Sequence, residues 1–215
     1  MKFRLTFALP FLILPVTTFA YLPNRLPGAT SITAKEFLTH RSRRLLVQEV
    51  LARRIVRTAD KMEVYHSSAF TLTLRYPTSW TMQETLFGSL VSFVSPAENA
   101  ADAVRENINV FVQEMHPNTP TLALYTLGTI TELKVMNPDL TFLASEAVTI
   151  GTLAAHSVTY EQPSIVGRLK FRQTWTIAHG TAYLFTFTAT PATFDQYEPI
   201  FQHMLDSFSV ESAEL

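Results

Sequence analysis

Hydrophobic and polar residues alternate along the middle of the chain with the two-residue period of half-buried β-strands. The clearest runs are Phe70 to Tyr76, Ile108 to Val112 and Leu169 to Ile177. Residues 90–95, 142–150 and 153–160 predict three further strands. His179-Gly180 fits a two-residue hairpin turn before a very apolar strand over residues 182–189, with Tyr183, Phe185 and Phe187 on one face.

Two segments have helical spacing instead. Thr119-Pro120 begins the first, because a capping hydroxyl is followed by Pro at the first helical position. The residues expected on its buried side are Leu122, Leu127, Ile130 and Leu133. Thr193 and Gln196 form a capping-box pattern before a closing helix. Its apolar stripe, at spacings of three and four, consists of Phe194, Tyr197, Phe201, Met204, Leu205 and Phe208.

This order of elements predicts the α+β class: one antiparallel sheet of short strands, with helices packed on it. The strands lie close together along the chain and are joined mostly by tight turns. We therefore expect a single sheet whose apolar face is covered by the closing helix, within one domain over residues 62–215.

The first twenty residues have the pattern of a signal peptide. Lys2 and Arg4 precede a short apolar run, and Thr18-Phe19-Ala20 ends in a small-x-small cleavage site. Residues 21–34 predict an irregular lead. We therefore expect an exported protein, periplasmic or extracellular, or in the thylakoid lumen if the source is photosynthetic.

Residues 35–61 predict a basic amphipathic helix, with eight Lys or Arg residues against three acidic ones. The apolar residues that recur at helical intervals are Leu38, Leu45, Leu46, Val50, Leu51 and Ile55. One interpretation is docking to an envelope protein or an anionic membrane surface. The other is a solvated surface helix that packs on its own domain.

Composition excludes several kinds of site. The chain of 215 residues has no Cys and a formal net charge of −1, which argues against disulfides, thiolate chemistry and nucleic acid as the main partner. We find no phosphate-binding loop and no Gly-x-Ser-x-Gly motif. The histidines are scattered, none at zinc-binding helical spacing, and are His40, His66, His116, His156, His179 and His203. We assign no catalytic or metal-binding residue, leave the cofactor-binding residues unknown, and expect a monomer.

Glu98, Asp102 and Glu106 form the densest group of carboxylates, spaced by four residues. Calcium prefers several oxygen ligands, so these three residues could begin a calcium site. The alternative is a solvated acidic loop, which we favour.

Several segments in this order resemble the PsbP-like family. They are Phe70–Trp80 with its Tyr-Pro-x-x-Trp ending, Val91–Pro96, Arg105–Val110, Gly151–Tyr160, Gly180–Ala189, Phe194–Tyr197 and Leu205–Phe208. The segment Ser95-Pro96 followed by Arg105-Glu-Asn-Ile-Asn109 is similar to the secreted bacterial branch of that family.

The resemblance implies an α/β/α sandwich around an antiparallel sheet, and a binding or assembly role in the cell envelope without catalysis. An alternative is an extrinsic lumenal subunit of photosystem II that supports calcium and chloride retention. A second alternative is a hydrolase whose triad is assembled from distant residues, since triads are defined by geometry rather than sequence order.

Overall fold

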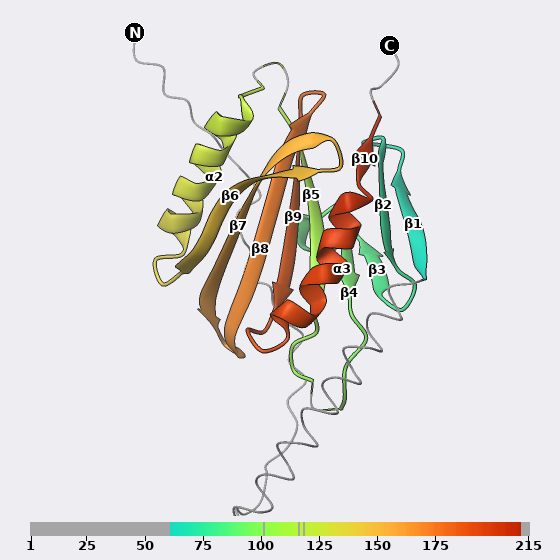
Figure 1. The fold of residues 1–215 in the computed structure, drawn as a ribbon, viewed down its shortest axis with the longest axis vertical. Helices are drawn as coiled ribbons and strands as arrows, with labels where there is room; N and C mark the ends of the chain where they lie inside the picture. The colour runs from blue at the N-terminus through green and yellow to red at the C-terminus, as the bar shows by residue number, and fades with distance from the viewer. Residues whose placement is uncertain (1–60, 101, 116, 118, 212–215) are drawn as a thin grey trace, which may run out of the picture.

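The computed structural model describes residues 61–100, 102–115, 117 and 119–211. The expected signal peptide, the irregular lead and the basic helix, apart from Lys61, lie outside these residues. The described chain forms two antiparallel sheets and two α-helices, so the α+β prediction is confirmed (Figure 1). No helix within the described ranges is long and apolar enough to cross a membrane.

The larger sheet has seven strands in the order β3-β4-β5-β9-β8-β7-β6, and every neighbouring pair is antiparallel. Its strands are β3 (Thr81–Glu84), β4 (Val91–Val94), β5 (Asn107–Glu114), β6 (Thr141–Ile150), β7 (Leu153–Ser164), β8 (Gly167–Ala178) and β9 (Thr181–Ala189). The strands from β6 to β9 follow one another through tight turns. The turn between β8 and β9 is the predicted one, with His179 and Gly180 both at positive φ.

A separate sheet of three strands corrects the expectation of a single sheet. It consists of β1 (Met62–Ser67), β2 (Leu72–Pro77) and β10 (Ser209–Val210), in the order β1-β2-β10. The predicted strand over residues 70–76 therefore belongs to this small sheet. The sequence pattern missed β1, β3 and β10, and a 3₁₀ turn, η1 (Leu86–Gly88), lies between β3 and β4.

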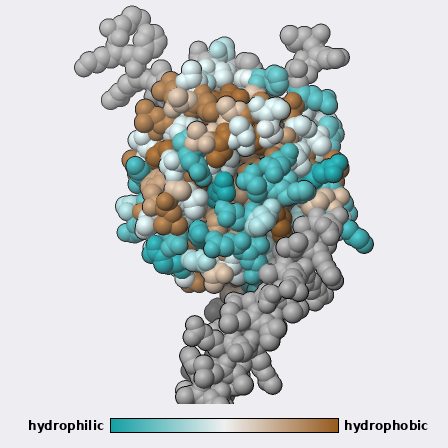
Figure 2. Space-filling view, viewed as in Figure 1, coloured by the Kyte–Doolittle hydropathy of each residue, from teal (hydrophilic) through white to brown (hydrophobic). Residues whose placement is uncertain are grey.

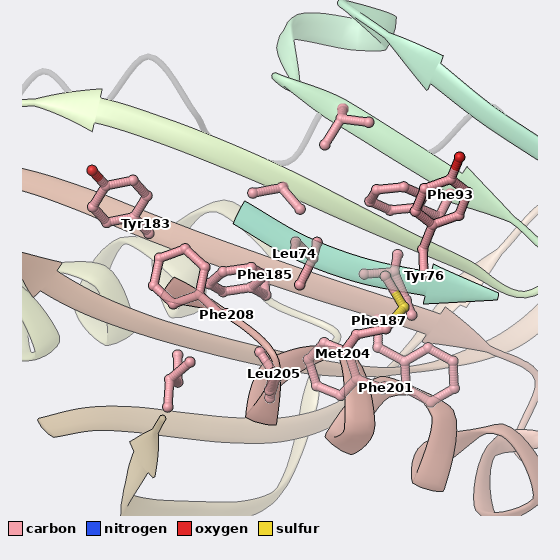
Figure 3. Close-up of a cluster of buried hydrophobic side chains, with 14 of the residues drawn as sticks. Leu74, Tyr76, Phe93, Tyr183, Phe185, Phe187, Phe201, Met204, Leu205 and Phe208 are labelled. Carbon is pink, nitrogen blue, oxygen red and sulfur yellow. The ribbon is translucent and has the colours of Figure 1, made fainter. Parts of the chain in front are cut away.

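The helix α3 (Phe194–Asp206) and the small sheet cover one face of the large sheet, as predicted for the closing helix. Figure 3 shows aromatic and aliphatic side chains from β2, β9 and α3 meeting in this core. Phe187 stacks on Phe201 at 5.5 Å between ring centroids, and Phe208 meets Phe185 edge-on at 5.0 Å. Every residue of the predicted stripe, from Phe194 to Phe208, is buried.

The helix α2 (Leu122–Met136) lies on the opposite face, over a second core that includes Tyr125, Leu133, Tyr160 and Trp175. The Trp175 Nε1–H donates to Thr126 Oγ1 at 2.9 Å and ties this helix to β8. The expected buried side is wrong at Leu127, whose side chain is 65% exposed. The cap is Thr121, two residues after the predicted Thr119, and its Oγ1 accepts from Leu124 N–H at 3.3 Å.

The predicted capping box at the start of α3 does not form. Thr193 precedes the helix, but its side chain caps no backbone N–H there. Its hydroxyl instead donates to Glu106 Oε1 at 2.6 Å. The carboxyl groups of Asp195 and Glu198 in the first turns pair with Lys170 and Arg172 of β8, at 3.3 and 2.8 Å.

Candidate functional site

The acidic segment between β4 and β5 folds against the beginning of α3. Glu106 is 1% exposed, and its Oε2 accepts from Ser95 Oγ at 3.0 Å while its Oε1 accepts from Thr193. Burial raises the pKa of this carboxyl, although both hydroxyl donors oppose the shift. Glu106 is thus a structural link between the β4–β5 segment and α3.

Glu98 and Asp102 are also engaged by protein donors. Tyr197 Oη donates to Glu98 Oε1 at 3.1 Å, and the backbone N–H of Glu98 donates to Asp102 Oδ2 at 3.0 Å. Burial, and then the charges of Glu106, Glu98 and Asp102, raise the pKa of the Tyr197 phenol. Glu98 therefore links the segment to α3 through Tyr197, and Asp102 holds the backbone of the same segment.

The same geometry bears on the calcium interpretation. Within the described ranges, no group of three or more His, Asp or Glu side chains is arranged to hold a metal ion. The carboxyl groups of Glu98, Asp102 and Glu106 accept hydrogen bonds from Tyr197, Ser95, Thr193 and backbone N–H groups. The arrangement stabilises the fold and gives no support to a calcium site.

One pair resembles part of a hydrolase site. Ser145 Oγ on β6 lies 2.9 Å from His156 Nε2 on β7, and the His156 ring lies 5.5 Å from the Trp175 ring. Burial lowers the pKa of His156, with Glu146 acting in the opposite direction. In the register, Ala147 pairs with His156 and Glu146 with Ser157, so Glu146 points to the opposite sheet face from His156. Among the residues that the structure describes, no carboxylate is hydrogen-bonded to this histidine, as a triad requires.

The other described histidines are not brought together with this pair. His66 lies on β1, where its Nδ1 is 3.3 Å from Thr73 Oγ1. His179 occupies the hairpin turn at a φ of 49°, as the sequence predicted, and His203 lies exposed in the last turn of α3. His40 and His116 lie outside the described residues.

An uncovered apolar surface runs along α2 and the beginning of β6, and we call it the α2–β6 surface. Its members are Leu124, Leu127, Val135, Met136 and Leu143, all exposed. Leu124, Leu127 and Val135 lie three and eight residues apart, which places them on one side of the helix. Hydrophobic residues are exposed on the side of the molecule that carries α2, whereas hydrophilic residues cross the front, where α3 lies (Figure 2).

Apolar helix residues gain free energy only when something covers them, and contiguous exposed apolar patches mark interaction sites. The sequence analysis missed this surface, since it assigned Leu127 to the core. The available signal was that α2 carries apolar residues on all sides, which is typical of a helix covered on more than one side.

Searches by sequence gave no match, neither to a family model nor to a curated protein. Comparison of folds gave matches to solved structures. The solution structure of the cyanobacterial PsbP protein CyanoP from Synechocystis sp. PCC 6803 matches with a TM-score of 0.54 and 14% identity, over 70% of this chain and 92% of that one.

Two further structures match at similar levels. LpqN, a Mycobacterium tuberculosis protein involved in cell envelope biogenesis, has a TM-score of 0.53 and 13% identity, over 71% of this chain and 91% of its own. PA94 from Pseudomonas aeruginosa, a protein of unknown function, has a TM-score of 0.51 and 17% identity, over 71% of this chain and 99% of its own. At these identities the likeness concerns the fold, and it confirms the predicted PsbP-like architecture.

Proposed function

We propose that this chain, which has the PsbP-like fold, is an exported, non-catalytic binding or assembly factor of the cell envelope. It is held at an anionic surface by the basic residues 35–61. The one observation that carries the proposal is a division of charge along the chain. Residues 61–211 contain seven Lys or Arg against fourteen Asp or Glu, whereas residues 35–60 contain seven basic and three acidic residues.

This division of charge assigns attachment to the surface to the basic segment and not to the folded domain. An acidic domain is repelled by anionic lipid, so attraction has to come from the basic segment, where each Lys or Arg near such a surface contributes about 1 kcal/mol. The described domain presents the exposed apolar α2–β6 surface, and such surfaces mark interaction sites. The role of LpqN in envelope biogenesis is consistent with such a function on this fold.

The test uses the chain from Tyr21 to Leu215 and sedimentation with lipid vesicles. We expect it to sediment with vesicles containing phosphatidylglycerol, to remain free with phosphatidylcholine alone, and to be released as salt shortens the Debye length. Changing Arg43, Arg44, Arg53 and Arg54 to Glu should abolish sedimentation, and changing the same four to Lys should preserve it. Salt-independent binding, or equal loss in both variants, would contradict the proposal.

The Ser145–His156 pair supports a second candidate, a hydrolase. It is tested by incubating the chain with a fluorophosphonate probe, which labels activated serines. Within the described residues no carboxylate is hydrogen-bonded to His156, so we expect a Ser145→Ala variant and the unmodified chain to show the same labelling. Labelling lost in Ser145→Ala and retained in Ser164→Ala, a serine of the same sheet, would establish the hydrolase instead.

A further inference from the structure

The strand β6 is an edge of the large sheet that lacks the usual protection. Within the described chain it pairs with β7 alone, so its outer side is open. It is ten residues long and contains one charged residue, Glu146, with neither Lys, Arg nor Pro. Natural sheets usually shorten their edges or protect them with Lys, Pro or charge. The opposite edge, β3, follows this rule with only four residues, all exposed.

The apolar face of α2 lies beside this edge. Lys134 Nζ is 5.0 Å from the centre of the Phe142 ring, so the C-terminal half of α2 lies against the beginning of β6. Val135 is 72% exposed there. An open strand edge and an uncovered helix side therefore adjoin on one side of the molecule.

We propose that a second copy of this chain covers the β6 edge, in a two-fold dimer in which β6 pairs antiparallel with β6 of the other copy around Ala147. The stretch from Ala144 to Ile150 supports this occupant. It has a regular register with β7, after an irregularity between Phe142 and Ala144, and Ala147 is its central residue. Pairing around Ala147 thus uses all of the regular stretch.

The side chains suit this register. Glu146 of each copy faces Val148 of the other rather than a second carboxylate, so no like charges meet directly. Ser145 faces Thr149, a pair of hydroxyl side chains that is favourable across antiparallel strands. Ala147 of one copy faces Ala147 of the other, and this small side chain allows the two strands to approach closely. A register centred on Glu146 would instead place two carboxylates opposite each other.

The symmetry also places the two α2 helices on one face of the joined sheet. When Ala147 of one copy faces Ala147 of the other, the two-fold axis is perpendicular to the sheet, so the same face of both copies carries α2. Within each copy, Trp175 of β8 donates to Thr126 of α2 at 2.9 Å, and Lys134 Nζ lies 5.0 Å from the centre of the Phe142 ring. The helix therefore runs from β8 towards the β6 edge, and the pairing of β6 with β6 itself holds the two copies together.

The proposed dimer differs from the monomer that we expected from the sequence, and it does not depend on the proposed function. The two are connected through avidity, because a dimer presents two basic segments to one surface and binds it more tightly than either segment alone.

The absence of Cys from the chain allows a clean cross-linking experiment. In the proposed register, two Ala147→Cys residues face each other with Cα atoms about 4.5–5.5 Å apart, within the range that a disulfide spans. Thr149→Cys is the matched control, on the same face of the same strand. Its two copies lie four residues apart along the strand, about 14 Å, and cannot be bridged.

Under mild oxidation at micromolar concentration, we expect a disulfide-linked dimer from Ala147→Cys and at least tenfold less from Thr149→Cys. Sedimentation of the unmodified chain should give a dimer. An Ala147→Glu variant, checked for native circular dichroism, would place two carboxylates opposite each other and should dissociate at least tenfold more readily. A monomeric unmodified chain, or equal cross-linking of both cysteine variants, would overturn the proposal.

Discussion

The Thr193 hydroxyl donates a 2.6 Å hydrogen bond to the buried carboxyl of Glu106, 87 residues earlier in the chain. This contact joins the β4–β5 segment to the residue that precedes α3. It also explains why the capping box fails: the hydroxyl that would cap the helix is used by a carboxyl in another element. A cap formed with Gln196 would leave Glu106 Oε1 without this donor inside the protein.

The first prediction concerns the pH dependence of stability at Glu106. Burial raises the pKa of this carboxyl in the folded protein above its value of 4.5, so folding favours the protonated form. Its contribution to stability is therefore fullest below pH 4.5 and declines as pH rises through the folded pKa. We expect Glu106→Gln to flatten the decline in melting temperature between pH 4.5 and neutral pH.

Thermal unfolding of both proteins at half-unit pH steps measures this effect. Glu114→Gln, at an exposed position at the end of β5, is the matched control for the loss of one carboxyl group. A Glu106→Gln profile that parallels the unmodified one would contradict the assignment.

The second prediction separates the two ion pairs between β8 and α3. Arg172 is mostly buried and also donates from Nε to Ser157 Oγ at 3.1 Å, so its bond to Glu198 at 2.8 Å is well oriented. Asp195 is 85% exposed, so water screens its contact with Lys170. We expect Glu198→Gln to cost about 0.5–1 kcal/mol of unfolding free energy, and Asp195→Asn only a few tenths. Urea denaturation measures both, and equal losses would contradict this ranking.

The third prediction compares two glycines that differ in their surroundings. Gly151, in the β6–β7 turn, has a φ of +55°, and a Cβ there would lie 3.1 Å from the carbonyl oxygen of Phe208. Gly128, inside α2, has nothing within 4 Å of such a Cβ. We expect Gly151→Ala to destabilise the fold by about 1–2 kcal/mol. Gly128→Ala should stabilise it by about 0.5–1 kcal/mol.

Chemical denaturation of the two variants checks the sign as well as the size. The same substitution should act in opposite directions at the two sites. If Gly151→Ala were neutral, the β6–β7 turn would have to shift away from Phe208 at no cost, which its tight hairpin geometry argues against.

Elements whose pattern arises from local burial could be read from the sequence. The alternation through β5 and the stripe of α3 are correct because each has one more deeply buried face, which selects apolar residues at a fixed period. The strand β9 is buried on both faces, and its continuous apolar run identified it. The strands β1 and β3 were missed because they are short and mix charges with apolar residues, and their pairing partners determine them more than their own sequences do.

Features that depend on distant contacts could not be read in this way. Leu127 was assigned to the core because α2 has apolar residues on every side, so its spacing does not single out one buried face. The carboxyls of Glu98, Asp102 and Glu106 looked like a loose acidic loop, but α3 brings Thr193 and Tyr197 to them. The Ser145–His156 contact follows from the pairing of β6 with β7, which no local motif signals.

The last prediction concerns removal of residues 21–60 from the exported chain. The core formed by the large sheet, α3 and the small sheet is complete within the described residues, with Leu72, Leu74 and Phe201 fully buried. We therefore expect the shortened protein to keep its circular dichroism and a cooperative thermal transition, while its retention on phosphatidylglycerol vesicles falls at least tenfold. If the shortened protein were instead unfolded, the basic segment would belong to the core, and its attachment role would be excluded. If the shortened protein were folded and its retention on the vesicles undiminished, the domain itself would be the part that attaches to the surface, despite its excess of acidic residues.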